Sequence, residues 1–235
     1  QRTVAVMPHA HIIILDLHGE YSYVKEGKRE YAFRETEVRH VDATALETPY
    51  WLMTYAELTD LFVDQSDFSA HNQVAAFRDI LGRLRVAEGA RLGLARTTVD
   101  TPVWFDLATL RAEIEQLNAR VPARTAGEMK DGPLTGKFSN FLMRLDSKLN
   151  DSRYNFLLKP AVRKDSASLT GLLKDFVGLG SKRAPVTVID LSSVPFDVRP
   201  TVAAQIGRLA FEFNYWNPRY REFPILLVCE EAHAY

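Results

Sequence analysis

Three short apolar runs divide the chain, and each begins shortly after a proline. They cover residues 12–15, 186–191 and 225–229 and are rich in Ile, Val and Leu. Continuous apolar runs of this length are typical of strands covered on both faces, as in a parallel sheet. Between the second and third runs, apolar residues recur every three or four positions over residues 200–213, which predicts a helix. The sequence therefore predicts an α/β fold with a strand–helix–strand crossover in a mainly parallel sheet.

The long interval between the first two strands has a different pattern. Its apolar residues recur at helical spacing over most of residues 50–179. We therefore predict a helical insertion at 50–179, carried by a sheet domain that residues 1–49 and 180–235 build together.

Charge and composition narrow the range of functions. The 29 Lys and Arg against 30 Asp and Glu leave a net charge of −1, which excludes a uniformly basic domain that binds nucleic acid by bulk charge. No apolar run approaches the roughly 20 residues needed to span a bilayer, so we expect a cytoplasmic protein without a membrane partner. Cys229, the single cysteine, ends an apolar run, which predicts a small buried core residue.

The third apolar run leads directly into the segment 230–233, Glu-Glu-Ala-His. An apolar strand that ends in two adjacent acids is the geometry of a Walker B element. There the first carboxylate helps to hold Mg²⁺, and the second polarises the water that attacks the γ-phosphate of ATP. Adjacent strand residues point to opposite sides, so Glu230 and Glu231 could take these two roles. The alternative is a solvated acidic turn after a strand.

Acids also follow the other two apolar runs. Asp16 opens the segment 16–21, Asp-Leu-His-Gly-Glu-Tyr, and Asp190 lies near the end of the second run. Because open α/β sheets bind ligands at the carboxyl ends of their strands, we expect Asp16, Asp190 and Glu230 to lie along one sheet edge. There Asp16 could orient water or Mg²⁺, or it could simply cap a turn that Gly19 makes possible.

Basic residues outnumber acidic ones locally over residues 137–164. Lys137, Arg144 and Lys148 have spacings of seven and four, which would place them on one face of a helix. On a near-neutral chain, a local excess of this kind is a candidate contact for phosphates or DNA. The alternative is an ordinary solvated face, or ion pairs with acids of the helix predicted at residues 107–117.

Three of these segments together resemble a known family. The segment 16–21, the segment 188–192 with the helix after it, and the segment 227–233 look like three successive signature segments of the HerA branch of the HerA/FtsK ATPases. The helical insertion of that family, which lies between the first two segments, also resembles residues 50–179. The resemblance extends over nearly the whole chain.

The resemblance implies a RecA-like P-loop ATPase core that uses ATP and Mg²⁺. It also implies a homo-hexameric ring that translocates double-stranded DNA and acts with a nuclease or another effector, in DNA-end processing or antiviral defence. Glu231 matches the catalytic glutamate of the family, Glu230 the neighbouring acid on the metal side, and Asp16 the acid after the second core strand. A non-enzymatic alternative on the same fold is a ring-forming platform that recruits a nuclease or antiphage effector and has little motor activity.

One departure from the family pattern is serious. No G-x-x-x-x-G-K-[ST] motif occurs in the 235 residues, and the Gly-Lys pairs at 27–28 and 136–137 lack the required glycines. In P-loop ATPases, this loop holds the phosphates of ATP. We therefore expect a partial domain of a longer protein, with the phosphate loop before Gln1 and an arginine finger beyond Tyr235. We also expect that the 235 residues alone neither hydrolyse ATP nor form a ring.

Two rival enzyme classes fit the sequence less well. Residues 230–233 also look like the D-E-A-H box of superfamily 2 helicases, but those proteins place their phosphate loop much closer to Walker B than the separation from Asp16 to Glu230 allows. A zinc hydrolase would need an H-E-x-x-H helix, which is absent. Among the six histidines, only His9 and His11 have a spacing that suits metal ligands.

Overall fold

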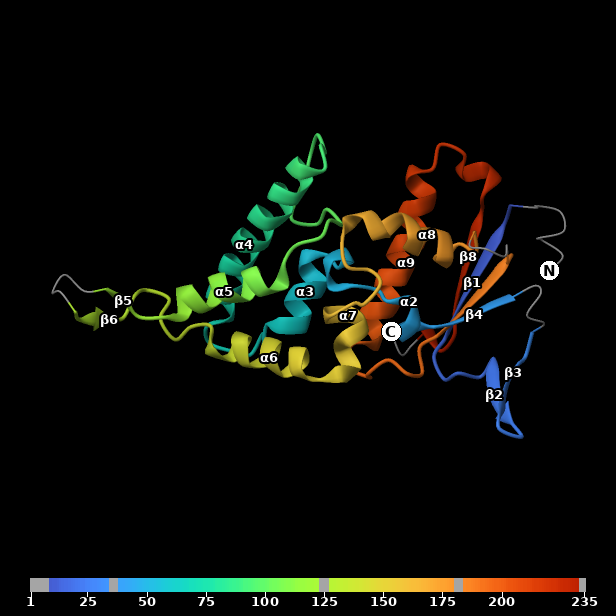
Figure 1. Ribbon diagram of the computed structural model, residues 1–235, viewed down its shortest axis with the longest axis horizontal. Coiled ribbons are helices and arrows are strands. Elements are labelled where there is room, and N and C mark those ends of the chain that lie inside the picture. The colour runs from blue at the N-terminus through green and yellow to red at the C-terminus, as the bar shows by residue number, and fades with distance from the viewer. Residues whose placement is uncertain (1–8, 34–37, 123–126, 180–183, 233–235) are drawn as a thin grey trace. The chain divides into compact units, whose positions relative to one another are not determined.

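The computed structural model describes residues 9–33, 38–122, 127–179 and 184–232. The chain forms two compact units, whose elements are labelled in Figure 1. The first unit combines residues 1–48 with residues 160–235, and the second spans residues 49–159. The second unit thus begins one residue before the predicted start of the helical insertion, and it ends well before residue 179.

A four-stranded parallel sheet forms the centre of the first unit. Its order is β4, β7, β1 and β8, which are Val38–Asp42, Val186–Asp190, His11–Asp16 and Ile225–Cys229. The three apolar runs that predict strands are therefore neighbours in one parallel sheet, which confirms the predicted α/β fold.

The two edge strands differ from what the sequence pattern predicts. The pattern indicates no strand at β4, because Arg39, His40 and Asp42 interrupt the apolar residues. As an edge strand of the described sheet, β4 keeps four of its five residues only partly buried, so it needs no continuous apolar run. At the other edge, β8 is also only partly covered, and Cys229 is exposed, so the prediction of a buried core cysteine is wrong.

Helices and a hairpin complete the first unit. Helix α9, Arg199–Trp216, forms the predicted crossover between β7 and β8, has proline in its first turn and packs against β8. The antiparallel hairpin of β2, Ser22–Lys25, and β3, Lys28–Tyr31, follows the loop after β1. The other elements are α2, Ala43–Leu46, α8, Leu169–Phe176, and the 3₁₀ turns Ser166–Ser168 and Tyr220–Glu222.

Polar contacts explain why residues 160–179 belong to the sheet unit rather than to the helical one. The Glu47 carboxylate accepts the backbone N–H groups of residues 161, 162 and 163 at 2.8, 2.8 and 2.9 Å. Arg39 of β4 and Arg163 both form ion pairs with Asp175 of α8, at 3.0 and 2.5 Å. These contacts fasten α8 to the sheet unit, although its helical spacing matches that of the insertion.

The second unit is mainly helical. Its helices are α3, Tyr55–Phe62, α4, Ala70–Arg91, α5, Leu107–Asn118, α6, Ser139–Asn150, and α7, Asn155–Leu158. It also contains the 3₁₀ turns Tyr50–Leu52 and Ser152–Tyr154 and a short hairpin of β5, Val121–Pro122, with β6, Met129–Lys130. The rings of Phe62, Phe77 and Phe141 pack with centroids 5.5 to 6.4 Å apart in its core. The buried Arg85 donates to the carbonyl oxygens of Trp51 and Met53.

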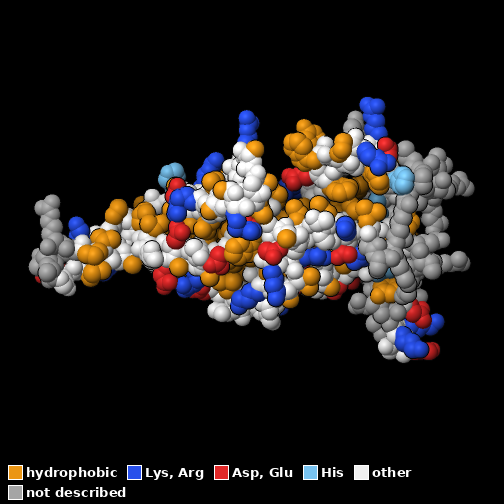
Figure 2. All heavy atoms as spheres, turned by 45° about the horizontal axis from the view of Figure 1, so that its top comes forward, with side chains coloured by type: hydrophobic (Ala, Val, Ile, Leu, Met, Phe, Trp, Pro, Cys, Tyr) orange, Lys and Arg blue, Asp and Glu red, His pale blue; other side chains and the backbone are white. Residues whose placement is uncertain are grey.

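The surface of the described chain carries both signs of charge. On the face shown in Figure 2, acidic and basic side chains lie interspersed among apolar ones, in keeping with the net charge of −1. No helix in the described ranges has both the length and the apolar character needed to cross a membrane.

Candidate functional site

Four acidic residues line the carboxyl edge of the sheet in the first unit. Asp42 pairs with Asp190 and Asp190 with Asp16 across β4, β7 and β1. Leu15 pairs with Cys229, so Glu230 follows at the level of Asp16. The prediction that Asp16, Asp190 and Glu230 share one edge is confirmed, and Asp42 extends the row. Neighbouring strands lie about 4.8 Å apart, so the row spans about 14 Å.

Asp16 shapes the loop that follows β1. The residue is only 1% exposed, and both of its carboxylate oxygens accept backbone N–H groups. Oδ1 accepts the N–H groups of Gly19 and Glu20 at 2.8 and 3.0 Å, and Oδ2 accepts that of Tyr21 at 3.1 Å. Asp16 therefore caps a turn, which is the structural alternative that the sequence left open. Its role in orienting water or Mg²⁺ stays a prediction.

Gly19 allows this loop to lie close to the neighbouring strand end. Its φ of +74° is in the left-handed region that favours glycine. A Cβ at this position would lie 3.1 Å from Oγ of Ser192 and 3.5 Å from the carboxylate oxygens of Asp190. Backbone conformation and lack of space thus both require glycine here.

Asp190 and Asp42 are also bound by local donors. Asp190 Oδ1 accepts the N–H and the hydroxyl of Ser192 at 2.8 and 2.6 Å. Asp42 Oδ1 accepts the hydroxyls of Thr44 and Ser193 at 2.6 and 2.8 Å and the N–H of Thr44 at 2.8 Å. Burial opposes ionisation of Asp42, but these hydrogen bonds together hold its pKa below the usual value. Asp42 therefore stays ionised and caps α2.

Glu230 is held by a tyrosine from the loop after β1. The hydroxyl of Tyr21 donates a hydrogen bond to Oε1 of Glu230, and the backbone N–H of Glu230 donates to the carbonyl of Leu15 at 3.4 Å. The hydrogen bond from the Tyr21 hydroxyl to Glu230, partial burial and the negative charges of Glu230, Asp16 and Glu20 raise the pKa of Tyr21 to about 12. The phenol therefore remains a donor at physiological pH. Tyr21 ends the segment 16–21, but the sequence indicates no role for it, because its partner Glu230 lies 209 positions away.

Glu231 follows with an unusual backbone conformation. Its φ of +49° lies in the left-handed region, which is uncommon outside glycine and recurs at functional sites. The residue is exposed, whereas Glu230 is half-buried. Both acids lie in the turn after β8, so their environments differ through the turn and not through the alternation of strand residues. The Walker B roles of Glu230 and Glu231 stay predictions. His233 lies outside the described residues, so the D-E-A-H resemblance is not tested at that position.

The three predicted basic contacts belong to the second unit, and each has a local partner there. Lys137 lies over the ring of Phe68 with Nζ 5.9 Å from the centroid. Arg144 pairs with Asp64 at 3.5 Å, and Lys148 lies 4.5 Å from the ring centroid of Tyr154. Lys137 precedes α6, so only Arg144 and Lys148 are aligned on that helix.

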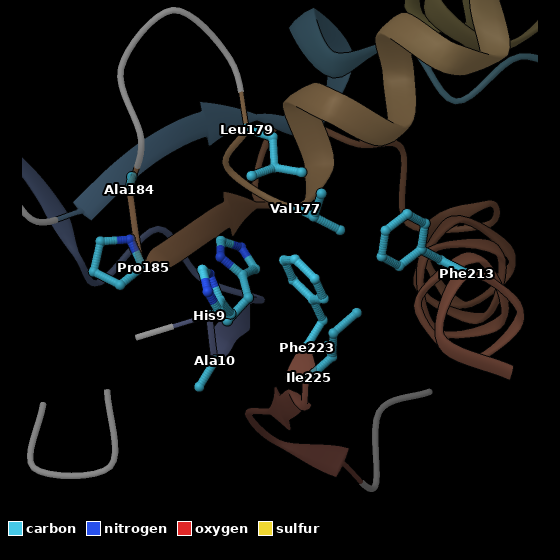
Figure 3. A pocket seen from close by; sticks show the side chains of 10 residues that line it. His9, Ala10, Val177, Leu179, Ala184, Pro185, Phe213, Phe223 and Ile225 are labelled. Carbon is cyan, nitrogen blue, oxygen red and sulfur yellow. The ribbon is translucent and has the colours of Figure 1, made fainter. Parts of the chain in front are cut away.

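The amino end of the sheet, opposite the acids, is lined by apolar and histidine side chains. A cavity of about 20 Å³ lies there, lined by residues at and before the starts of β1, β7 and β8 and by Val177, Leu179 and Phe213 (Figure 3). The His9 ring lies 5.0 Å from that of Phe223, and the buried His11 binds the hydroxyl of Thr187 through Nε2 at 3.0 Å. No group of three or more His, Cys, Asp or Glu able to hold a metal is found among the described residues.

Residues 1–210 match the family described as the central domain of the helicase HerA. The chain belongs to this family. The sheet unit is accordingly an α/β ATPase core of the HerA/FtsK type. A comparison with curated proteins finds no match.

The acids of this HerA-type core suit Mg²⁺ but not the phosphates of ATP. Mg²⁺ prefers carboxylate oxygens, and one or two protein carboxylates suffice when substrate phosphates and water complete its octahedron. Glu230 and Glu231 at the sheet edge meet this requirement. Phosphates need backbone N–H groups and a lysine, and the 235 residues contain no motif that supplies them.

Proposed function

We propose that this chain supplies the metal-side and water-activating acids of an ATP-driven translocase of double-stranded DNA that works as a homo-hexameric ring. The observation that carries the proposal is the pair Glu230–Glu231, which follows β8 at the acidic edge of a parallel sheet. Membership of the HerA central-domain family supports it. The cofactors are ATP and Mg²⁺.

Glu230 and Glu231 take different catalytic roles because their environments differ. Glu231, exposed and in a left-handed conformation, polarises the attacking water as a general base. Glu230, held by Tyr21, serves the metal side. When bound, Mg²⁺ neutralises the charge that develops on the phosphates. Asp16 accepts the backbone N–H of Tyr21, so it affects the site indirectly, by fixing the loop that carries Tyr21.

A second candidate function is a ring-forming platform that recruits a nuclease or an antiphage effector. The observation that favours it is that Lys137, Arg144 and Lys148 each contact an acidic or aromatic side chain of their own unit. Side chains with such partners are less available to phosphates, so duplex DNA would stimulate ATP turnover little. If the ring does translocate DNA, these three residues are its candidate DNA contacts.

The test is ATP turnover by the complete gene product, measured with and without duplex DNA, for the wild type and Glu231→Gln. We expect DNA to stimulate the wild type. The amide should retain nucleotide binding but reduce turnover by roughly 10²-fold or more, since it cannot accept the proton of water. Glu26→Gln, at the exposed tip of the β2–β3 hairpin, is the matched control and should behave as wild type. Wild-type turnover by Glu231→Gln would refute the role of Glu231, and an absence of DNA stimulation would favour the platform.

A further inference from the structure

Among the four acids at the described strand ends, Glu230 is the one whose carboxylate has a single hydrogen-bond donor. Asp16, Asp42 and Asp190 accept hydrogen bonds from donors two to five residues away or from the adjacent strand end. Glu230 accepts the phenol of Tyr21 from the loop after the adjacent strand β1, much as Asp42 accepts the hydroxyl of Ser193 from the loop after β7. Its carboxylate makes no other hydrogen bond within the described ranges, so Oε2 keeps its full capacity to bind a cation.

Three contacts fix the position of Tyr21. Its backbone N–H donates to Asp16 at 3.1 Å. Its ring stacks on that of Phe33 with centroids 5.2 Å apart and an interplanar angle of 14°. Both rings pack against the cluster of Val38, Val186 and Val188 on the sheet. A tyrosine ring has few rotatable bonds, so these contacts leave its hydroxyl little freedom.

We propose that Tyr21 is a positioning residue for the metal-side acid: its hydroxyl holds Oε1 of Glu230 and thereby presents Oε2 for Mg²⁺. The inference rests on the proposed function, since it assigns Mg²⁺ to Glu230. Carboxylates that bind metals are commonly oriented by a second hydrogen bond, and loss of that partner typically costs 10- to 100-fold in metal affinity or activity.

A purely structural role for Tyr21 makes a different prediction. If the hydrogen bond only fastened β8 to the loop after β1, its loss would lower the stability of the fold and leave the affinity for the metal unchanged. The distinction therefore requires a measurement of metal binding that does not depend on turnover.

The experiment uses the complete gene product with a non-hydrolysable ATP analogue and measures bound Mn²⁺ by electron paramagnetic resonance. Tyr21→Phe keeps the ring stack and removes the hydroxyl, and we expect it to raise the Kd for Mn²⁺ about 10-fold. Half-maximal ATP turnover should need correspondingly more Mg²⁺. Tyr31→Phe is the matched control, because Tyr31 stacks on His40 in the same row of rings and, in the described part of the chain, its hydroxyl has no hydrogen bond.

A double-variant cycle completes the test. If Tyr21 acts through Glu230, Tyr21→Phe should add nothing to the loss of Mn²⁺ affinity caused by Glu230→Gln. Wild-type Mn²⁺ affinity in Tyr21→Phe, or losses that simply add in the double variant, would overturn the inference. A wild-type protein that shows neither Mn²⁺ binding nor ATP turnover would instead refute the proposed function, so the two failures are distinguishable.

Discussion

The two ends of the parallel sheet use the same strands for opposite purposes. At the carboxyl end, carboxylates at the ends of the four described strands accept hydrogen bonds from the loops, so polar groups determine the geometry. At the amino end, β1, β7 and β8 begin around a mainly apolar cavity of about 20 Å³ (Figure 3). His11, which lines this cavity, forms a buried polar pair with Thr187. Residues that could contribute to catalysis therefore lie at only one of these two ends. Variants at the carboxyl end should affect both stability and ATP turnover, whereas variants at the amino end should affect stability alone.

The largest effect on stability is expected at Asp16. Asp16→Ala removes a buried acceptor of three backbone N–H groups in a partly exposed loop, and we expect it to lower the free energy of unfolding by about 3 kcal/mol. ATP turnover should fall as well, because the loop carries Tyr21. Urea unfolding of the complete gene product measures the first effect. Asp16→Asn retains one acceptor oxygen and should lose about half as much. Wild-type stability of the alanine variant would show that the cap is dispensable.

A smaller loss is expected at Gly19. Gly19→Ala places a Cβ 3.1 Å from Oγ of Ser192 at a φ of +74°, which should cost about 1–2 kcal/mol of unfolding free energy. Gly27→Ala is the control, since Gly27 has a φ of +76° but no atom within 4 Å of its added Cβ. The difference between the two variants isolates the close approach to β7. Equal losses would mean that only the backbone conformation matters.

The smallest loss of unfolding free energy is expected at the amino end of the sheet. Thr187→Val removes the hydroxyl that binds the buried His11, and we expect a loss of about 1 kcal/mol in the free energy of unfolding. ATP turnover by the complete gene product should stay at the wild-type rate, because the pair lies at the opposite end of β1 and β7 from the acids. A fall in turnover as large as that of Asp16→Ala would break the separation between the two ends.

The alternation of apolar runs and helical spacing predicts most of the fold. Strands β1, β7 and β8 and helix α9 lie where the apolar residues predict them. In the central strands β1 and β7, the continuous apolar run agrees with cover on both faces. The pattern misses β4, which is an edge strand with partly exposed polar residues. It also extends the helical insertion through α8, because helical spacing alone does not indicate which unit a helix contacts.

For the candidate site, the sequence by itself determined three of the four acids at the strand ends and that these three share one edge. Strand direction and periodicity are local properties, and they suffice to place Asp16, Asp190 and Glu230. Only the tertiary structure decided what each carboxylate does. Asp16 turned out to cap a loop, and Tyr21 to hold Glu230 across 209 positions of sequence. Such partners depend on side-chain directions and on the approach of two loops in space, which no local pattern of residues encodes.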